Sequence, residues 1–406
     1  MERGNVGRRV GPVPFFKLPR SSMQFEFATA TRIIFGPGAI SQIGSLAREF
    51  GKRALLVTGR TADRAEKLRS NLAAREITCV PFQVAGEPTV DLVTSGIRFA
   101  RDEQCDLVIS LGGGSVIDAG KAIAAFLTNT GDVIDYLEVI GQGKPLTRPP
   151  APFLAIPTTA GTGTEVTRNA VLASIPHRVK VSLRSPLLLA KIALIDPELT
   201  YDLTPALTAS TGLDALTQLI EPYVSIRSNP LTDGFCIEGM RRVARSLQRA
   251  YRNSHDAPAR EDMALASLLG GLALANAALG AVHGFAAPLG GSFHAPHGAV
   301  CAALLSHAME MNVRALRERQ PGSEPLRRYE EVARVLTGHG QARAEDGVRW
   351  VRDLCEALQA PRLRAFGVTE DHFSELVEKA AKASSMRGNS IVLTPDEMRE
   401  VLGRAL

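Results

Sequence analysis

The stretch that decides the fold is Cys105-Asp-Leu-Val-Ile-Ser-Leu111, followed by Gly112-Gly113-Gly114-Ser115. The first segment has the apolar pattern of a buried strand, and residues 116–126 have the pattern of a helix. A strand that runs through glycines into a helix exposes backbone N–H groups, which an anion can approach closely. The stretch matches neither G-x-G-x-x-G nor the phosphate loop of ATPases, which ends in Gly-Lys-Ser/Thr. Taken alone, it is equally well explained as a tight turn that binds no ligand.

The same alternation of strands and helices continues on both sides of this stretch. Buried-strand patterns occur at Arg53–Thr58, Phe153–Ile156 and Ile192–Ile195, and a helical pattern runs from Gly59 through Leu68. Such alternation predicts a parallel sheet covered on both faces. From Thr204 onward strand patterns nearly vanish and periodic Leu and Ala dominate. We therefore expect an α/β N-terminal domain at residues 23–200, an all-α C-terminal domain at residues 201–406, and a boundary near residues 197–205.

Composition excludes several classes of protein. The 406 residues are 45% apolar and 22% charged, which is typical of a globular protein of two domains. No apolar run reaches the ~18 residues that span a bilayer, so we expect no membrane partner. The net charge of +5 comes without aromatic residues interleaved among the arginines, and we expect no nucleic-acid partner. The glycine- and alanine-rich run from Leu268 to Ala287 is interpreted as a buried, tightly packed helix.

The cysteines and the first residues bear on location. The five cysteines are an odd number without a C-x-x-C pair, which favours a reducing compartment and a cytoplasmic protein. Residues 1–22 are basic, contain proline and lack an apolar signal core. We interpret them as a disordered extension ahead of a natural start at Met23. An arginine-rich transit peptide is the alternative.

A second polar loop follows the predicted strand at Phe153–Ile156. It reads Pro157-Thr158-Thr159-Ala160-Gly161-Thr162-Gly163-Thr164-Glu165. Hydroxyls and free N–H groups at this density suit a diphosphate, although such a loop can be merely a capped turn. Two loops of this kind at strand ends of one sheet favour a crevice for a dinucleotide.

Three residues from distant parts of the C-terminal half have the chemistry of a metal site. Asp214, His283 and His297 offer a carboxylate and two imidazoles, which can bind a divalent ion such as Fe²⁺ or Zn²⁺. Gln218 lies four residues after Asp214, so both side chains share one face of a helix. The position expected for a fourth ligand therefore carries an amide.

Seven motifs in order along residues 24–298 resemble the iron-containing (group III) alcohol dehydrogenase family. They are Phe35-Gly36-Pro37-Gly38, Gly112-Gly-Gly-Ser-Val-Ile-Asp118, Pro157-Thr-Thr-Ala-Gly-Thr-Gly-Thr-Glu165, Ile195-Asp-Pro-Glu-Leu199, Gly212-Leu-Asp-Ala-Leu-Thr217, Val282-His-Gly284 and Pro296-His-Gly298. The resemblance implies a dinucleotide-binding N-terminal domain, a helical domain for metal and substrate, and an active site between them. It also implies a homodimer or a higher homo-oligomer.

The resemblance implies a role for each matching residue. Gly113, Gly114 and Ser115 match the cofactor diphosphate site, and Asp118 lies near the nicotinamide ribose. The other cofactor-binding positions are Thr158, Thr159, Thr162 and Lys180. Asp214, His283 and His297 match three metal ligands, two of which, His283 and His297, are also the candidate catalytic residues.

The family's remaining metal ligand is normally histidine and falls on Gln218. An amide oxygen is a neutral, weaker donor than imidazole, but three good ligands still suffice for a catalytic ion with an open position. The alternative is a site without metal, as in the related maleylacetate reductases. The histidine that some members carry four residues after His283 is Ala287 here, and His294 is a nearby candidate without an assigned role.

Cofactor choice depends on the end of the strand at Arg53–Thr58. Members strict for NAD commonly carry Asp there, whereas this chain has Gly59 and Arg60. Glycine removes a carboxylate that would repel a 2′-phosphate, and Arg60 or Arg64 can pair with that phosphate. We therefore expect NAD(P) with a preference for NADP, the alternative being that both arginines are simply solvated.

The resemblance implies an NAD(P)-dependent alcohol dehydrogenase or aldehyde reductase that moves hydride between the nicotinamide and a small alcohol or aldehyde. A reductase for carboxylated substrates would require a cationic anchor, for which Arg168 is a candidate. A lyase similar to dehydroquinate synthase would require more phosphate-binding cations than the sequence offers. The last alternative is a non-catalytic protein that still binds the dinucleotide.

Overall fold

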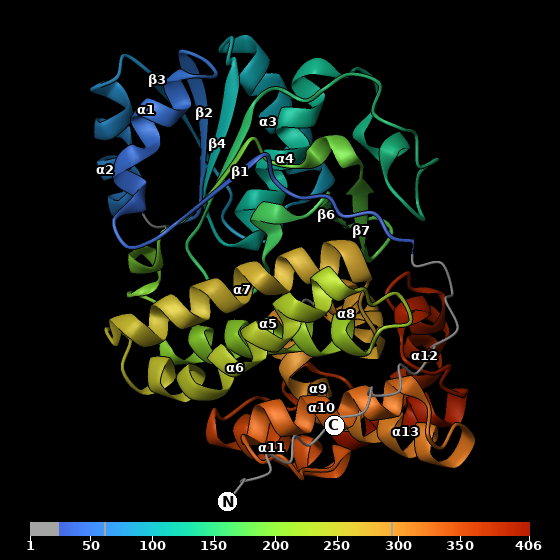
Figure 1. Ribbon diagram of the computed structural model, residues 1–406. Helices are drawn as coiled ribbons and strands as arrows, with labels where there is room; N and C mark the ends of the chain where they lie inside the picture. The colour runs from blue at the N-terminus through green and yellow to red at the C-terminus, as the bar shows by residue number, and fades with distance from the viewer. Residues whose placement is uncertain (1–23, 61, 294) are drawn as a thin grey trace, which may run out of the picture.

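The computed structural model describes residues 24–60, 62–293 and 295–406, so the extension expected at residues 1–22 lies outside the described part. An α/β layer built on a six-stranded parallel sheet lies above a helical region (Figure 1). The expected fold class is therefore confirmed. The strands are β1 (Arg32–Phe35), β2 (Arg53–Thr58), β3 (Thr78–Gln83), β4 (Leu107–Gly112), β5 (Phe153–Pro157), β6 (Asn169–Ser174), β7 (Val179–Arg184) and β8 (Ile192–Ile195).

The main sheet has the strand order β1-β8-β5-β4-β2-β3, and every pairing in it is parallel. The chain runs from β2 to the edge strand β3 and then returns to place β4 on the other side of β2. The order of strands therefore reverses between β2 and β4. In open parallel sheets, ligands bind outside the carboxyl ends of the strands at such a reversal.

Helices cover both faces of this sheet, as its continuous apolar strands predict. Apolar residues of α1 (Ile43–Arg48) and α2 (Ala62–Ala73) pack on one face, and those of α3 (Val90–Asp102) and α4 (Gly114–Thr128) pack on the other. Strand β4 is buried along its whole length. The four strands that the sequence predicts all form, and α4 begins two residues before its predicted start.

The sequence patterns did not reveal β1, β3, β6 and β7. The last two form an antiparallel hairpin outside the main sheet, with Ala173 opposite Lys180. Strand β7 is only partly buried, and it packs against a helix of the C-terminal half. Its mixed polar and apolar pattern lacks the continuous apolar run of the central strands, which is why it was missed.

No strand occurs after β8 among the described residues, and the remainder is helical. The expected domain boundary near residues 197–205 stays a prediction. The helices are α5 (Pro205–Val224), α6 (Pro230–Arg252), α7 (Ala257–Ala277), α8 (Ala281–Phe293), α9 (His297–Arg319), α10 (Glu324–Thr337), α11 (Ala344–Ala357), α12 (Phe373–Lys382) and α13 (Pro395–Ala405).

The run from Leu268 to Ala287 is not the single helix that we expected. It is largely buried, but it is divided into α7 and α8, whose axes meet at 99°. Ala278 makes the break with φ = 63°, a left-handed conformation that is uncommon for a residue other than glycine. No single helix in the described part of the chain is long and apolar enough to span a membrane; this bent pair passes such a test by length and composition only.

The loop after β5 contacts the helical region through glycines. A Cβ atom at Gly161 would lie 2.7 Å from Thr211 Cβ on α5. Gly163 and Gly271 touch backbone to backbone, so a Cβ atom on Gly271 of α7 would lie 2.7 Å from Gly163 Cα and still closer to its carbonyl oxygen. The side-chain-free positions therefore allow the polar loop to lie directly against α5 and α7.

The substitution Gly271→Ala should reduce the free energy of unfolding by about 1–3 kcal/mol, the usual cost of overpacking. Urea unfolding monitored by circular dichroism measures the change. Gly234→Ala on α6 is the matched control, because a Cβ atom there meets nothing within 4 Å. Alanine at that exposed helical position should raise the free energy of unfolding by about 0.5–1 kcal/mol. Equal stability of Gly271→Ala and the unmodified protein would contradict the inferred close contact.

Candidate active site

The two polar loops that the sequence singled out lie side by side. They follow the neighbouring strands β4 and β5, and the amide of Thr158 donates to the Gly112 carbonyl at 3.0 Å. A Cβ atom on Gly113 would lie 3.4 Å from Thr159 Cγ2, and one on Gly114 would lie 3.0 Å from Thr162 Cγ2. The glycines at the start of α4 therefore face the half-buried threonines across van der Waals distance.

A buried lysine joins the two loops from below. The ammonium of Lys121 on α4 donates to the carbonyls of Thr164 at 2.5 Å, Thr167 at 2.8 Å and Asn169 at 3.0 Å. Burial lowers the pKa of this lysine to about 8, although the charge of Asp118 opposes the shift. Lys121 thus holds the segment after β5 against α4 and fixes the position of the second polar loop relative to the first.

The residues predicted to bind the rest of the cofactor differ in burial. Asp118 is buried on α4, and its Oδ1 has no hydrogen-bond partner among the described residues. Burial raises the pKa of this carboxyl, against the charge of Lys121. Gly59 directly follows β2 at the reversal of strand order, and Arg60 is exposed; the side chain of Arg64 is not described.

Lys180 lies on β7 opposite the helical region. It forms an ion pair with Glu87 at 2.9 Å, and a Cβ atom on Gly290 of α8 would lie 3.2 Å from its Nζ. Lys180, Glu87 and Gly290 line a cavity of about 280 Å³ between the hairpin and α8. Lys180 therefore stands where the α/β domain meets α8.

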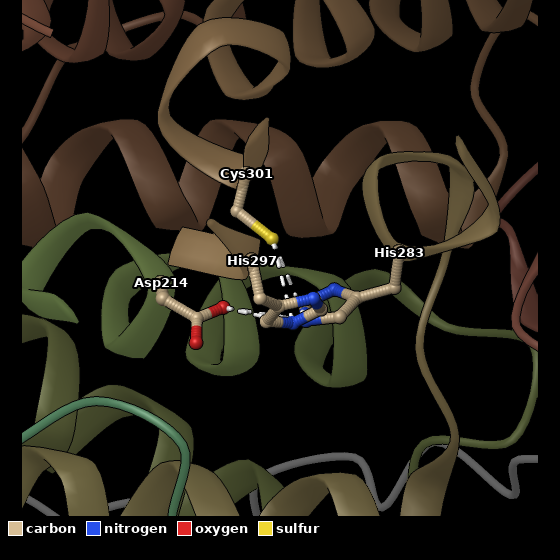
Figure 2. A group of neighbouring side chains, drawn as sticks. All are labelled: Asp214, His283, His297 and Cys301. Carbon is tan, nitrogen blue, oxygen red and sulfur yellow. Dashed lines mark hydrogen bonds and ion pairs between the residues drawn. The ribbon is translucent and has the colours of Figure 1, made fainter. Parts of the chain in front are cut away.

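Asp214, His283 and His297 converge with a fourth residue, Cys301 (Figure 2). Helix α5 carries Asp214, α8 carries His283, and α9 carries His297 and Cys301. One ligand atom from each of the four lies within 4.8 Å of the others. Asp214 Oδ1 is 3.4 Å from His283 Nε2 and 3.7 Å from His297 Nε2.

A buried glutamate orients His283. Glu221 Oε2 lies 2.7 Å from His283 Nδ1, which directs the opposite ring nitrogen, Nε2, toward Asp214. The same carboxylate accepts hydrogen bonds from the amides of Gly280 at 2.9 Å and Val282 at 2.7 Å, at the start of α8. A carboxylate behind a histidine is the usual outer partner of a metal-binding imidazole.

The cluster is strongly polarised. Burial alone would lower the pKa of His283, but Cys301, Glu221 and Asp214 together raise it well above its ordinary value. Burial alone would raise the pKa of Asp214, yet His297 and His283 hold it below the usual range. Burial raises the pKa of the Cys301 thiol to about 12. Burial lowers the pKa of His297, so the electrostatics favour a positive charge on His283 beside the Asp214 carboxylate.

The donor set fits a divalent cation. Asp214 Oδ1 and Gln218 Oε1 are both buried and make no hydrogen bond within the described residues. Buried polar atoms without partners are rare and call for an explanation such as an ion. A carboxylate, two imidazoles and a thiol are ligands that Zn²⁺ and other transition metals accept.

Three other candidates from the sequence remain to be placed. The side chain of Arg168 pairs with Glu26 at 3.1 Å. His294 lies outside the described residues. Gln218 is buried on α5, one turn after Asp214, where the spacing placed it.

Sequence reasoning missed Cys301 and Glu221. Cys301 follows His297 by four residues, and Glu221 follows Asp214 by seven, so each shares a helix face with a recognised candidate. That spacing was an available signal. Neither residue could be assigned without knowing that α5, α8 and α9 meet.

Comparison with known proteins identifies the family of this chain. The family model described as "Iron-containing alcohol dehydrogenase" matches residues 30–197. The model of the C-terminal part of the Fe-containing alcohol dehydrogenase family matches residues 208–406. Together they cover most of the chain.

Individual relatives extend over nearly the whole length. Alcohol dehydrogenase 4 of Saccharomyces cerevisiae is 34% identical over 91% of this chain and 96% of its own. The 1,3-propanediol dehydrogenase of Klebsiella pneumoniae is 36% identical over 91% and 95%. The crystal structure of a 1,3-propanediol oxidoreductase superposes with a TM-score of 0.87 at 34% identity, covering 95% of this chain and all of that one. The protein is therefore an oxidoreductase that belongs to the iron-containing alcohol dehydrogenase family.

Proposed function

We propose that this enzyme transfers hydride between NADP(H) and a small alcohol or aldehyde, assisted by a divalent metal, Fe²⁺ or Zn²⁺. The observation that carries the proposal is the convergence of Asp214, His283 and His297, in which both imidazole Nε2 atoms face the buried Asp214 Oδ1. These three residues would hold the ion, and Gln218 Oε1 is a further neutral donor on the same helix face as Asp214. When bound, the metal would polarise the substrate oxygen and so promote hydride transfer.

The carboxyl edge of the sheet provides the matching cofactor site. Gly113, Gly114 and Ser115 present backbone N–H groups at the N-terminus of α4, where the helix dipole favours a diphosphate. A Cβ atom on Gly114 would lie 3.0 Å from Thr162 Cγ2, so glycine lets the threonine loop approach the start of α4 closely. The unpaired Asp118 Oδ1 is an acceptor for a ribose hydroxyl, and Lys180 is a donor on the side facing α8.

Glu221 and the helix packing position the reacting groups. Glu221 fixes the tautomer and direction of His283, so its Nε2 faces the space shared with Asp214. Asp214 and His283 are almost completely buried, whereas His297 is half-buried and marks the accessible side. This asymmetry gives substrate one direction of entry and keeps water from the opposite side.

The 2′-phosphate of NADP is the basis of the proposed cofactor preference. Gly59 follows β2 at the reversal of strand order and brings no carboxylate there. Arg60 is exposed and available to a phosphate. We further propose a homo-oligomer, at least a dimer, in the cytoplasm. Light scattering after gel filtration measures the oligomeric state.

The metal-independent reductase is the main competing proposal, and metal analysis separates the two. Protein purified without added metal should contain about one metal ion per chain and should oxidise NADPH with small aldehydes. Chelation should abolish this activity, and Zn²⁺ or Fe²⁺ should restore it, since three protein ligands suffice for a catalytic ion. Full activity after complete removal of metal would favour the metal-independent mechanism. Nucleotide binding without turnover of any aldehyde would identify a non-catalytic binder.

Gly59→Asp should reverse the cofactor preference. A Cβ atom at Gly59 meets only Val116 Cγ2 at 3.8 Å, so a side chain can begin there without a clash. The added carboxylate should lower kcat/KM for NADPH by about tenfold or more, equivalent to ~1.4 kcal/mol, while NADH is less affected. Gly59→Asn is the matched control, because it adds the same bulk without charge. An equal loss for both cofactors in both variants would refute the charge argument.

Glu221→Gln should weaken metal binding by roughly 10–100-fold, the usual effect of losing an outer carboxylate partner. The amide keeps one oxygen for the α8 N–H groups but loses the charge that supports His283. Competition with a chromophoric chelator measures the dissociation constant. Glu238→Gln on α6, which removes only a surface partner of Arg242, is the control. Unchanged metal affinity in folded Glu221→Gln would show that this carboxylate does not support the site.

A further inference from the structure

Cys301 stands where a metal ligand would stand. It is completely buried, and its sulfur lies beside polar atoms. Cys301 Sγ lies 3.7 Å from His297 Nε2 and 3.9 Å from His283 Nε2, the two nitrogens that face Asp214. Figure 2 shows the thiol pointing at the imidazoles from the helix above them. A buried cysteine commonly acts as a small apolar side chain, but here the nearest polar atoms belong to metal-ligand candidates.

The spacing of the four ligand atoms fits one tetrahedral ion. Metal bonds of about 2.3 Å to sulfur and about 2.0–2.1 Å to nitrogen or oxygen, at tetrahedral angles, separate sulfur from nitrogen by roughly 3.6 Å. The same geometry separates nitrogen from oxygen by roughly 3.4 Å. The sulfur–nitrogen distances here are 3.7 and 3.9 Å, and the nitrogen–oxygen distances are 3.4 and 3.7 Å. These four separations are therefore already close to those that an ion requires, and the atoms all lie within 4.8 Å of one another.

We propose that Cys301 is the fourth protein ligand of this site, as a thiolate, in a set completed by Asp214, His283 and His297. The inference rests on the proposed metal-assisted function and names a ligand that it did not include. A thiolate is an anionic donor, whereas an amide is a weak neutral one. Cys301 therefore compensates for the weak donor at Gln218. On binding, the metal displaces the thiol proton, which passes to solvent.

The thiolate also biases the choice of metal. Soft sulfur ligands favour Zn²⁺ over ions that prefer nitrogen and oxygen. Two anionic ligands, Asp214 and Cys301, neutralise a divalent ion, whereas three neutral donors with one carboxylate leave a positive charge. Cys301 should therefore increase the affinity for Zn²⁺ more than the affinity for Fe²⁺.

X-ray absorption of the full-length protein loaded with Zn²⁺ tests the ligand directly. We expect one sulfur at about 2.3 Å and the remaining ligands at about 2.0–2.1 Å. A shell of nitrogen and oxygen alone would overturn the proposal. This measurement uses the unmodified chain, so it does not depend on whether a variant folds.

Variants test whether Cys301 binds the metal, both by the absorption spectrum of the Co²⁺-loaded protein and by the dissociation constants of Zn²⁺ and Fe²⁺. The Co²⁺-loaded protein should show a near-ultraviolet thiolate-to-cobalt absorption band, which Cys301→Ser should abolish. Cys79→Ser on β3, distant from the site, is the matched control and should retain the band.

Cys301→Ser should also weaken Zn²⁺ binding by more than the roughly 100-fold limit for an outer partner. The ratio of Fe²⁺ to Zn²⁺ dissociation constants should fall by about tenfold or more; a band that persists or a ratio that is unchanged in folded Cys301→Ser would refute the assignment.

These measurements use no nucleotide and no alcohol, so the two proposals can fail separately. A sulfur ligand in a protein that transfers no hydride would leave the assignment of Cys301 standing and overturn the proposed function. Metal-dependent hydride transfer with a sulfur-free metal shell would do the reverse.

Discussion

The candidate site depends on the hydrogen bonds that the Glu221 carboxylate makes to the start of α8 and to His283. This carboxylate comes from α5, two turns after Asp214, and it accepts the amides of Gly280 and Val282 where α8 begins. Those amides would otherwise be buried donors without partners, at the positive end of a helix dipole. Oε2 of the same carboxylate also meets His283 Nδ1, so one side chain fixes both the start of α8 and the direction of the imidazole.

The second requirement is that two halves of the chain approach closely. The loop after β5 touches α5 and α7 through glycines, and Lys180 of β7 lies against Gly290 of α8. Because glycines allow these close contacts, the loop that we assign to the cofactor lies directly beside α5, which carries the proposed metal ligand Asp214. Lys121 completes the arrangement by holding this loop to α4 through three carbonyls. Hydride transfer requires such proximity between the nicotinamide and the polarised carbon.

The ligand set shows how a site can change one member without losing its geometry. Gln218 occupies the position on α5 where the family resemblance implies histidine, and its Oε1 remains unpaired. Cys301 reaches the same space from α9, one turn after His297. In our proposal the donor strength lost on α5 is regained on α9. The consequence would be a softer, more nearly neutral centre than an aspartate with three imidazoles provides.

Local patterns in the sequence were sufficient for the fold class, the central strands, both polar loops and the family. Apolar periodicity reports burial, and residue order preserves motifs, so these properties need no knowledge of long-range contacts. The break at Ala278, the hairpin of β6 and β7 and the roles of Glu221 and Cys301 were beyond such reasoning. Spacing shows that Cys301 shares a helix face with His297, but not that this face meets Asp214 and His283. Only the packing of α5, α8 and α9 decides that, because it is set by side-chain and backbone contacts between segments far apart in the chain.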